Sequence, residues 1–326
     1  MEIFFARGDD ASEEFHNGED ARGTVVALGN FDGVHLGHRR LLEEAAALAS
    51  RDGLRPCVFC FRGHTDETLR PGEPVRYLTS VEERAALFEQ AGMQAAIFED
   101  FPRVCGMPVP EFIEKILLGR LRCGHAVCGF DYRFGRGGEG DANFLRDSLA
   151  GHGAGCTVVA PVTVGEQIVS STLIRQYIEE GDMPAAVAML GRPYSIRTPV
   201  VHGQGLGGTL GIPTVNQRFP AGRAIPARGV YVCECDFGAG LRRGVCNVGT
   251  RPTVSDTAEI TCETHILDFD GDLYGRTVEI RFLRRLRDER KFSGIEELRE
   301  RIMRDIESAK RFQITDNSAC GRFPGQ

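Results

Sequence analysis

The sequence of 326 residues has no tryptophan, no long apolar run and no recognisable export signal. No stretch of about 18 apolar residues occurs in it, and a helix that spans a membrane needs one of that length. Residues 1–10 lack a basic segment followed by a sustained apolar one, so we expect no secretory leader. We therefore expect a protein that neither crosses a membrane nor has one as its partner.

The sequence also lacks an excess of positive charge and a disulfide pattern. Its 39 basic and 46 acidic residues give a formal net charge of −7, which argues against nucleic acid as a partner, although local phosphate sites stay possible. The 11 cysteines are odd in number and scattered, unlike those of a small secreted domain, so we expect reduced thiols and a cytoplasmic protein. Cys57 and Cys60 have CxxC spacing without a second pair, and we expect no zinc there.

The composition is that of a folded protein of two ordinary domains. Hydrophobic residues make up 42% and charged residues 26% of the chain, and 40 Gly with 15 Pro lie below low-complexity levels. The predicted parts are an N-terminal extension over 1–22, a first domain over 23–183, a second domain over 184–311 and a disordered tail over 312–326.

The first domain has the pattern of strands that alternate with helices. The predicted strands are 24–28, 57–61, 95–98, 127–129 and 157–162, and the predicted helices are 39–49, 81–90, 110–118 and 173–180. Strands joined by helical crossovers form a parallel sheet, which binds ligands at the carboxyl ends of its strands. We expect the site in the loops that follow the strands.

The second domain has strands without intervening helices. They are predicted at 200–201, 230–236, 243–248, 259–269 and 277–286. Such strands, joined by glycine-rich or polar turns, suggest a small antiparallel barrel, because closure removes exposed sheet edges. A helix at 295–310 follows, and its apolar face is expected to pack on the barrel through Ile295, Leu298, Ile302 and Ile306.

Residues 29–38 follow the first predicted strand and open its helix. His35 and His38 stand three positions apart, and Gly37 between them lets a phosphate approach the backbone at the helix start. Neither serine nor cysteine separates the histidines, so we expect no covalent nucleophile. The predicted chemistry is in-line attack on phosphorus, with both imidazoles stabilising charge on its oxygens. The alternative is that the two histidines are structural.

Residues 169–175 form a second candidate phosphate site. Ser170, Ser171 and Thr172 supply hydroxyls at a helix start, and Arg175 lies one turn further on. Such a run is often only a helix cap. Its place in the last crossover of the domain, with the histidines in the first, favours the functional interpretation.

The second domain has a glycine-rich loop at 203–211. Its glycines leave the backbone free to wrap a phosphate chain, and Thr214 and Asn216 after it project to one side as neutral oxygen ligands suited to Mg²⁺. The alternatives are a flexible hairpin for this loop and, for Glu263 on a later strand, an ordinary solvated glutamate.

Three segments of the first domain, 29–38, 129–141 and 170–175, carry a resemblance to a known family. They resemble the FMN adenylyltransferase half of bacterial bifunctional riboflavin kinase/FAD synthetases, a Rossmann-like α/β nucleotidylyltransferase of the HxGH type. The resemblance implies that the phosphates of ATP lie over the catalytic residues His35, His38 and Arg175. It implies nucleotide binding by Gly29, Asn30, Phe31, Gly37, Ser171 and Thr172, and flavin binding by Asp131 and Phe134.

The second domain resembles the riboflavin kinase module, a six-stranded antiparallel barrel followed by a helix. Residues 211–216, 229–231, 249–253, 263–265 and 286–292 match its motifs in order. The resemblance implies that Thr214 and Asn216 hold Mg²⁺ and ATP and that Glu263 is the base for the terminal ribityl hydroxyl of riboflavin. It also implies nucleotide binding by Gly203, Gly207 and Gly211, and flavin binding by Arg287.

The sequence departs from the family pattern in both domains. The family carries Phe-Asp-Pro-His-Pro after the second strand, where this chain has Arg62 and Gly63 before His64. In the second domain Thr198 replaces a glycine, and Gly208 replaces an arginine that would be placed to bind phosphate.

The leading hypothesis is an enzyme that converts riboflavin to FMN and FMN to FAD, using ATP and Mg²⁺. The alternatives are an enzyme with one of the two activities, a flavin- or nucleotide-binding paralogue without turnover, and another HxGH substrate such as a pantetheine phosphate. The sequence indicates no oligomeric state.

Overall fold

The structure is a computed structural model, which describes residues 1–5, 23–203, 206–209, 211–251, 259–290 and 292–313. The chain divides into two compact units at Ser171 and Thr172. The sequence placed the boundary after residue 183, and that boundary stays a prediction. Most of the predicted extension and tail, 6–22 and 314–326, lies outside the described residues, as do parts of the matched motifs at 204–205, 252–258 and 291.

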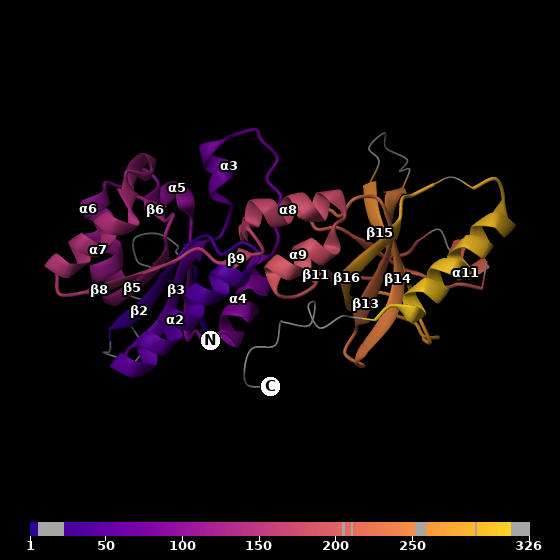
Figure 1. Cartoon of the computed structure of the whole chain (residues 1–326), viewed down its shortest axis with the longest axis horizontal. Helices are drawn as coiled ribbons and strands as arrows, with labels where there is room; N and C mark the ends of the chain where they lie inside the picture. Colours follow the sequence, from indigo (N-terminus) through magenta and orange to yellow (C-terminus); the bar gives the residue numbers. More distant parts are fainter. Residues whose placement is uncertain (6–22, 204–205, 210, 252–258, 291, 314–326) are drawn as a thin grey trace. The chain divides into compact units, whose positions relative to one another are not determined.

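The first unit is built on a six-stranded sheet whose strands are parallel, as the sequence predicted (Figure 1). Its spatial order is β1 (Glu2–Phe5), β4 (Ala95–Glu99), β3 (Arg55–Phe61), β2 (Thr24–Leu28), β5 (Cys123–Gly129) and β8 (Gly155–Val159). β1, which the sequence assigned to the extension, pairs with β4 at the edge of this sheet. The central strands are apolar on both faces, as in parallel sheets that helices cover on both sides.

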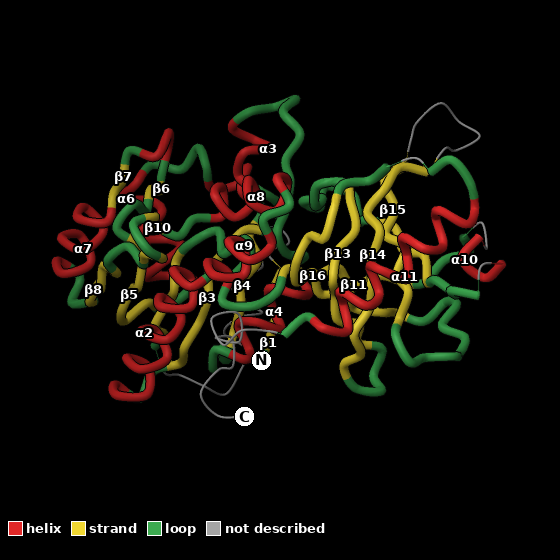
Figure 2. The backbone as a smooth tube through the Cα atoms, turned by 45° about the vertical axis from the view of Figure 1, so that its right-hand side comes forward, coloured by secondary structure: helices red, strands yellow, loops and turns green. Residues whose placement is uncertain are grey.

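Helices cover the two faces of this sheet (Figure 2). α2 (Leu36–Asp52) and α4 (Val81–Gln90) pack on the face that includes Val25 and Ala27. η1 (Phe112–Arg120) and α7 (Ala142–Gly151) pack on the opposite face, with Val26 and Leu28. The sequence predicted an ordinary helix at 110–118, whereas η1 is a π-helix whose wider turn buries neighbouring pairs of apolar residues against the sheet.

The remaining elements of the first unit are short. They are α3 (Thr65–Leu69), α5 (Phe101–Val104), α6 (Val109–Glu111), β6 (Arg133–Phe134), η2 (Arg136–Gly138), β7 (Gly140–Asp141), β9 (Thr163–Val164) and β10 (Gln167–Ile168). Cys57 and Cys60 point into the two cores from β3, and burial raises the pKa of Cys60 to about 12. Both thiols are therefore protonated core residues.

The strand order creates a topological switch point between β2 and β5. From β2 the chain crosses to β3 on one side, and β5 pairs with the other side of β2. Ligands of open α/β sheets bind in the crevice outside the carboxyl ends of such strands. The two loops that begin there are 29–35 and 130–132, the regions that the sequence analysis selected.

The second unit contains an almost closed antiparallel barrel, as predicted. Its strands follow the order β11 (Tyr194–Pro199), β16 (Thr277–Arg287), β13 (Gly229–Asp236), β14 (Leu241–Arg251), β15 (Glu259–Ile266) and β12 (Val215–Arg218). A bridge between Val201 and Asn216 brings the two edges together beyond the end of β11. The strand that the sequence predicted at 200–201 lies just beyond the end of β11, where Val200 and Val201 form isolated bridges, and neither β11 nor β12 was predicted.

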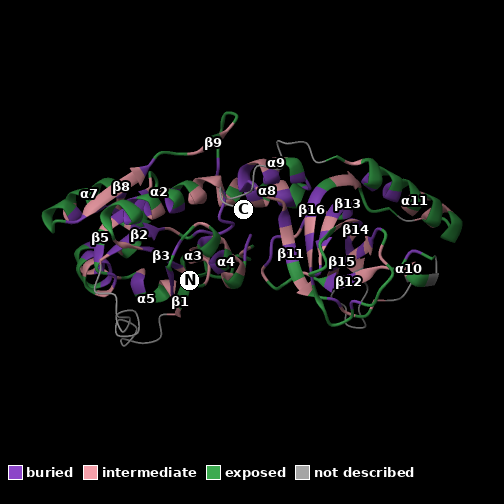
Figure 3. Cartoon of the chain, turned by 90° about the horizontal axis from the view of Figure 1, so that it is seen from below, coloured by how far each residue is buried: buried purple, intermediate pink, exposed green. Residues whose placement is uncertain are grey.

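The barrel is flanked by helices within its own unit. α8 (Ser171–Glu180) and α9 (Met183–Leu190) precede it, α10 (Leu206–Thr209) lies in the glycine-rich loop, and α11 (Ile295–Arg311) packs along β13 and β14. Figure 3 shows the exposed outer side of α11. Ile306 and Ala309 are buried against the barrel. Ile295, predicted on that face, is 61% exposed, because the packed face begins further along the helix.

Across the described ranges, no helix is both long and apolar enough to cross a membrane.

Candidate functional sites

The turn after β2 has an unusual backbone. Phe31 and Val34 adopt positive φ values of 53° and 39°, and both side chains are fully buried. Positive φ is uncommon outside glycine and is unfavourable for a β-branched residue such as Val34. Strained residues of this kind cluster at functional sites, where the surrounding structure must hold them.

Asp32 fastens this turn to the segment before α4. Its buried carboxylate accepts hydrogen bonds from the main-chain N–H of Leu78, at 2.9 Å, and of Thr79, at 3.1 Å. The Thr79 hydroxyl also donates to Asp32 and accepts from the N–H of Gly33, at 2.8 Å. This buried acidic side chain therefore stabilises the turn by binding it to the segment before α4.

The two histidines lie together at the start of α2. Nδ1 of His35 accepts the main-chain N–H of His38 at 3.2 Å and so caps the helix. Because Nδ1 is the acceptor, the neutral ring carries its proton on Nε2. The imidazoles stack with centroids 3.6 Å apart and planes 14° from parallel. His35 is 6% exposed and His38 is half-buried, so His38 is the more accessible of the pair.

Two predicted nucleotide-binding glycines make room for neighbouring rings. A Cβ on Gly37 would lie 3.2 Å from Nδ1 and Cε1 of His35, and one on Gly29 would lie 3.2 Å from the ring of Phe31. Real Cβ contacts are rarely this short, so both glycines preserve the shape of the turn. Their contact with a nucleotide stays a prediction.

The loop after β3 has its own local partners. Arg62 forms an ion pair with Asp100 at 3.7 Å and lies over the ring of Phe5. His64 caps α3 by accepting the N–H of Asp66, and its own N–H donates to the hydroxyl of Tyr77. Burial and the nearby carboxylate of Glu67 raise the pKa of Tyr77 to about 12, so this hydroxyl stays protonated.

Asn30 connects this loop to the turn after β2. Its Nδ2 donates to the hydroxyl of Thr65 at 3.3 Å. A Cβ on Gly63 would lie 2.7 Å from the carboxylate of Glu67. The substituted loop is therefore adapted to its neighbours, although it lacks the two prolines of the family pattern.

The loop after β5 carries the predicted flavin-binding residues. Asp131 is exposed, whereas Phe134 is 6% exposed and packs on the rings of Phe112 and Tyr132. Gly140 permits this packing, because a Cβ there would lie 2.7 Å from the Phe134 ring. Phe134 supports the loop from the core, and its contact with a flavin stays a prediction.

The predicted second phosphate segment begins at the boundary between the units. The hydroxyl of Ser171 donates to the main-chain oxygen of Asp32 at 2.8 Å, so Ser171 lies against the turn after β2. Thr172 and Arg175 fall in the second unit, and their approach to the histidines stays a prediction.

In the barrel, Glu263 is centred between two asparagines. Asn216 on β12 and Asn247 on β14 are its register partners, so the three side chains share one face of the sheet. Asn216 is 6% exposed, and its buried Oδ1 has no hydrogen-bond partner among the described residues. An unsatisfied buried oxygen of this kind fits a hard cation such as Mg²⁺.

The glycine-rich loop approaches this group closely. A Cβ on Gly203 would lie 2.3 Å from Nδ2 of Asn216, and one on Gly207 would lie 3.2 Å from the hydroxyl of Thr214 and 2.5 Å from the oxygen of Ile212. Only glycine allows the backbone this near to both predicted ligands. Gly211 has φ 72° and supplies a left-handed turn in the same loop.

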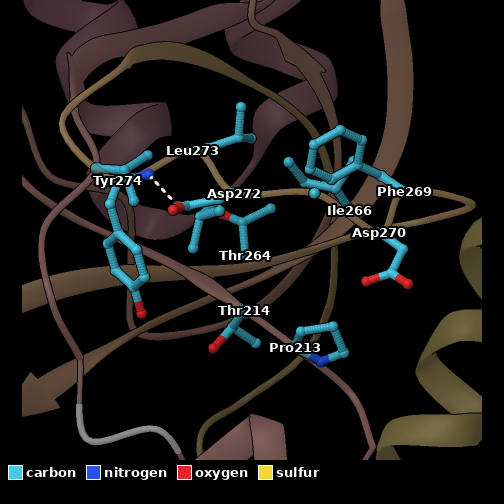
Figure 4. A pocket seen from close by; sticks show the side chains of 12 residues that line it. Pro213, Thr214, Thr264, Ile266, Phe269, Asp270, Asp272, Leu273 and Tyr274 are labelled. Atoms are coloured by element: carbon cyan, nitrogen blue, oxygen red, sulfur yellow. Dashed lines mark hydrogen bonds between the residues drawn. The ribbon is translucent and has the colours of Figure 1, made fainter.

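A cavity of about 250 Å³ opens beside Thr214 (Figure 4). Pro213 and Thr214 line one side of it, and the loop at 269–274 lines the other. Tyr274 in that loop donates its N–H to Asp272 and stacks on His202 with centroids 4.0 Å apart. The cavity places a largely apolar recess next to a predicted magnesium ligand.

Arg287, predicted to bind flavin, is committed to a buried ion pair. Its Nε and Nη2 lie 2.9 Å from the carboxylate of Asp305 on α11, which is 3% exposed. This pair ties the end of β16 to the final helix. A direct contact of Arg287 with flavin stays a prediction. Glu289 reaches β14 next to Asn247, since a Cβ on Gly249 would lie 2.4 Å from the Glu289 carboxylate and 3.0 Å from Nδ2 of Asn247.

The two departures in the barrel have different surroundings. The hydroxyl of Thr198 accepts from Nε2 of Gln217, a fully buried side chain that also bonds to two main-chain oxygens. Thr198 therefore has a structural partner. A Cβ on Gly208 would meet nothing within 4 Å among the described residues, so a side chain can begin there without a clash.

Ligand types limit which metal the chain can hold. In the part of the chain that the structure describes, no three His, Cys, Asp or Glu side chains are grouped to bind a metal ion. A site made from Thr214 and Asn216 would thus rely on neutral oxygens and on the phosphates of ATP, an arrangement that suits Mg²⁺.

Sequence reasoning missed several residues of both sites. Arg84, Thr79, Asn247 and Glu289 reach the sites only through the folded arrangement of distant segments. A signal was present for Glu289, which lies in one of the matched motifs, and for Asn247, which stands two residues before another.

Comparison with known proteins places both sites in context. A family model described as FAD synthetase matches residues 17–173, and one described as riboflavin kinase matches residues 190–313. Bifunctional riboflavin kinase/FMN adenylyltransferases from Bacillus subtilis and Pseudomonas fluorescens are each 36% identical to this chain; they align over 90% and 89% of it and over 94% and 93% of their own length. The enzyme of the same name from Escherichia coli K12 is 34% identical over 89% of this chain and 93% of its own.

A solved structure resembles the whole fold. A crystal structure described as a macrolide-efflux protein from Streptococcus pneumoniae has a TM-score of 0.87 and 29% identity, and the alignment covers 96% of this chain and 100% of that one. Fold, sites and matches together define a two-domain transferase that uses ATP. The chain belongs to the family of bifunctional riboflavin kinase/FMN adenylyltransferases, which confirms the resemblance seen in the sequence.

Proposed function

We propose that this chain converts riboflavin and ATP to FMN and ADP in the barrel, and FMN and ATP to FAD and pyrophosphate in the α/β unit. The observation that supports this proposal most strongly is that the FAD synthetase model and the riboflavin kinase model both match this one chain. Each match covers one of the two candidate sites. A chromatographic assay that resolves riboflavin, FMN and FAD tests it with purified protein, ATP and Mg²⁺. If the protein forms FMN but no FAD, or forms FAD only when FMN is added, it has one of the two activities. If it binds flavin or nucleotide tightly without turnover, it is a binding paralogue.

In the α/β unit, a phosphate oxygen of FMN attacks the α-phosphorus of ATP, and the bond to pyrophosphate breaks. His35 and His38 stabilise the charge that develops on the phosphate oxygens, His35 through its Nε2–H, since its Nδ1 is occupied by the helix cap. The amides at the start of α2 contribute in the same direction. The family pattern further implies that Thr172 and Arg175 bind the phosphates of ATP, and that Asn30 and Asp131 contact the nucleotide and the flavin phosphate.

In the barrel, Glu263 accepts the proton of the ribityl hydroxyl as its oxygen bonds to the γ-phosphorus of ATP. An alcohol hardly ionises at neutral pH, so base and bond formation must act together. Thr214 and Asn216 would hold Mg²⁺, as the unsatisfied Oδ1 of Asn216 supports. When bound, Mg²⁺ neutralises charge on the transferred phosphoryl group. Gly203, Gly207 and Gly211 let the loop follow the phosphates. A cytoplasmic location is part of the proposal.

Changing Gly203 to alanine is expected to lower the rate of FMN formation by about ten-fold. Its Cβ would lie 2.3 Å from Nδ2 of Asn216 and displace a predicted magnesium ligand. The rate of FMN formation, measured over a series of Mg²⁺ concentrations, checks this. Gly208→Ala is the matched control, because a Cβ there meets nothing within 4 Å. Equal rates in the two variants would show that the close approach of the Gly203 backbone to the Asn216 side chain does not matter for FMN formation.

Changing Gly208 to arginine is expected to lower the KM for ATP in FMN formation by about ten-fold or more, the effect of one added charged hydrogen bond. Gly208 is exposed, and a Cβ there would meet nothing within 4 Å among the described residues. Gly208→Gln has similar reach without charge and should leave the KM nearly unchanged. If both variants behave like the wild type, the phosphates of ATP do not pass this part of the loop.

A further inference from the structure

Arg84 is a buried arginine whose hydrogen-bond acceptors are all main-chain oxygens. It is the fourth residue of α4 and is 4% exposed. Nη1 donates to the main-chain oxygens of Asn30, at 3.1 Å, and Phe61, at 2.8 Å, and Nη2 donates to that of Arg62, at 2.9 Å. The guanidinium also lies over the ring of Phe98, 5.3 Å from its centroid.

These three oxygens belong to two different segments, the turn after β2 and the end of β3 with the loop that follows it. Asn30 begins the turn after β2 that carries the histidines, whereas Phe61 and Arg62 end β3 and begin the loop that departs from the family pattern. A buried cation must be satisfied by partners, and the rigid planar fork of a guanidinium fixes their directions. Arg84 therefore sets the distance between the two loops.

A second contact holds the same segment to the histidine turn. Just before α4, the N–H groups of Leu78 and Thr79 bind the carboxylate of Asp32. Residues 78–84 thus bind the turn at two points. Leu78, at one end of this segment, contacts the Asp32 side chain, and Arg84, at the other end, contacts the Asn30 carbonyl. A shift of α4 would move the histidine turn and the loop after β3 relative to each other.

We propose that Arg84 is a positioning residue for adenylyl transfer, which holds the ATP-binding turn and the loop after β3 in the alignment that in-line attack needs. This inference rests on the proposed function of the α/β unit. Arg84 touches neither reacting phosphorus nor oxygen and acts through the two loops. Its loss should therefore reduce the rate at saturation more than the binding of either substrate.

The test uses the full-length chain with Arg84→Met and Arg84→Lys. For Arg84→Met we expect kcat for FAD formation to fall by about 100-fold, the effect of a small misplacement of reacting groups, while the KM values for ATP and FMN change little. Arg84→Lys keeps the charge and some of the donors and should recover part of kcat. Titration of FMN fluorescence should give the wild-type binding stoichiometry in both variants.

The control is Arg55→Gln. Arg55 is also largely buried, with its side chain 11% exposed, and it pairs with Glu2 at the opposite end of β3. We expect it to lower thermal stability without changing kcat. FMN formation in the barrel should be unchanged in every variant.

Three results would overturn the proposal. They are a wild-type kcat in Arg84→Met, an equal loss of kcat in Arg55→Gln, and a fall in kcat that matches a fall in binding stoichiometry. If Arg84→Met does not fold, the kcat of Arg84→Lys at full stoichiometry decides, and a wild-type value there counts against the proposal. Failure of the wild-type chain to make FAD would reject the proposed function itself, which is a different outcome.

Discussion

Replacement of His38 by alanine is expected to lower the rate of FAD formation by about 10²–10³-fold, the usual cost of removing one donor that stabilises transition-state charge. His38 is the more exposed of the stacked pair, so it is the better placed to reach a phosphate oxygen. The main-chain N–H of His38 still caps α2 through His35 after the change, and the helix should persist. Initial rates of FAD formation from FMN and ATP measure the effect.

The other unit supplies the internal control for this experiment. FMN formation from riboflavin should be as fast in His38→Ala as in the wild type, since it takes place in the barrel. His152→Ala is the matched variant, because this exposed histidine lies in the same unit at the end of α7. If His38→Ala forms FAD at the rate of His152→Ala, the histidine turn is not the catalytic site.

Replacement of Glu263 by glutamine is expected to slow FMN formation by about 10²–10⁴-fold, the range for loss of a general base. Glutamine keeps the size of the side chain and removes its ability to take the proton. Asn216 and Asn247, its register partners, should stay in place because the strand pairing is unchanged. Turnover of riboflavin, followed as FMN, gives the measurement.

Glu259→Gln is the control on the same strand. Glu259 also lies on β15, but its carboxylate pairs with Arg218 at 3.2 Å. This variant should form FMN normally, and both variants should make FAD normally from supplied FMN. A rate of FMN formation in Glu263→Gln close to that of Glu259→Gln would remove Glu263 from the role of base.

Much of the fold could be predicted because the signals are local. The first predicted strand and the helix at 81–90 have the bounds seen in β2 and α4. Both follow from short apolar runs and helix periodicity. The sequence did not predict β1, which is four residues long and is defined only by its pairing with β4.

The site residues divide in the same way. The spacing of His35 and His38 on a helix start was visible in the sequence, and so was the alternation of Thr214 and Asn216. Arg84 looked like an ordinary charged residue of an amphipathic helix, and nothing local distinguishes it from a solvated one. It is buried only because two loops from other parts of the chain converge on it.

By itself, the sequence determined the family, the order of the two units and the chemical types of the candidate site residues, because periodicity and motif spacing are properties of neighbouring residues. The tertiary structure alone decided which side chains meet across the chain. It paired Asn247 with Glu263 across two strands, bound the Asp32 carboxylate to the main-chain N–H of Leu78, and joined Asp305 to Arg287 in an ion pair. Such contacts depend on strand order and register, which join segments far apart in sequence and which no local pattern specifies.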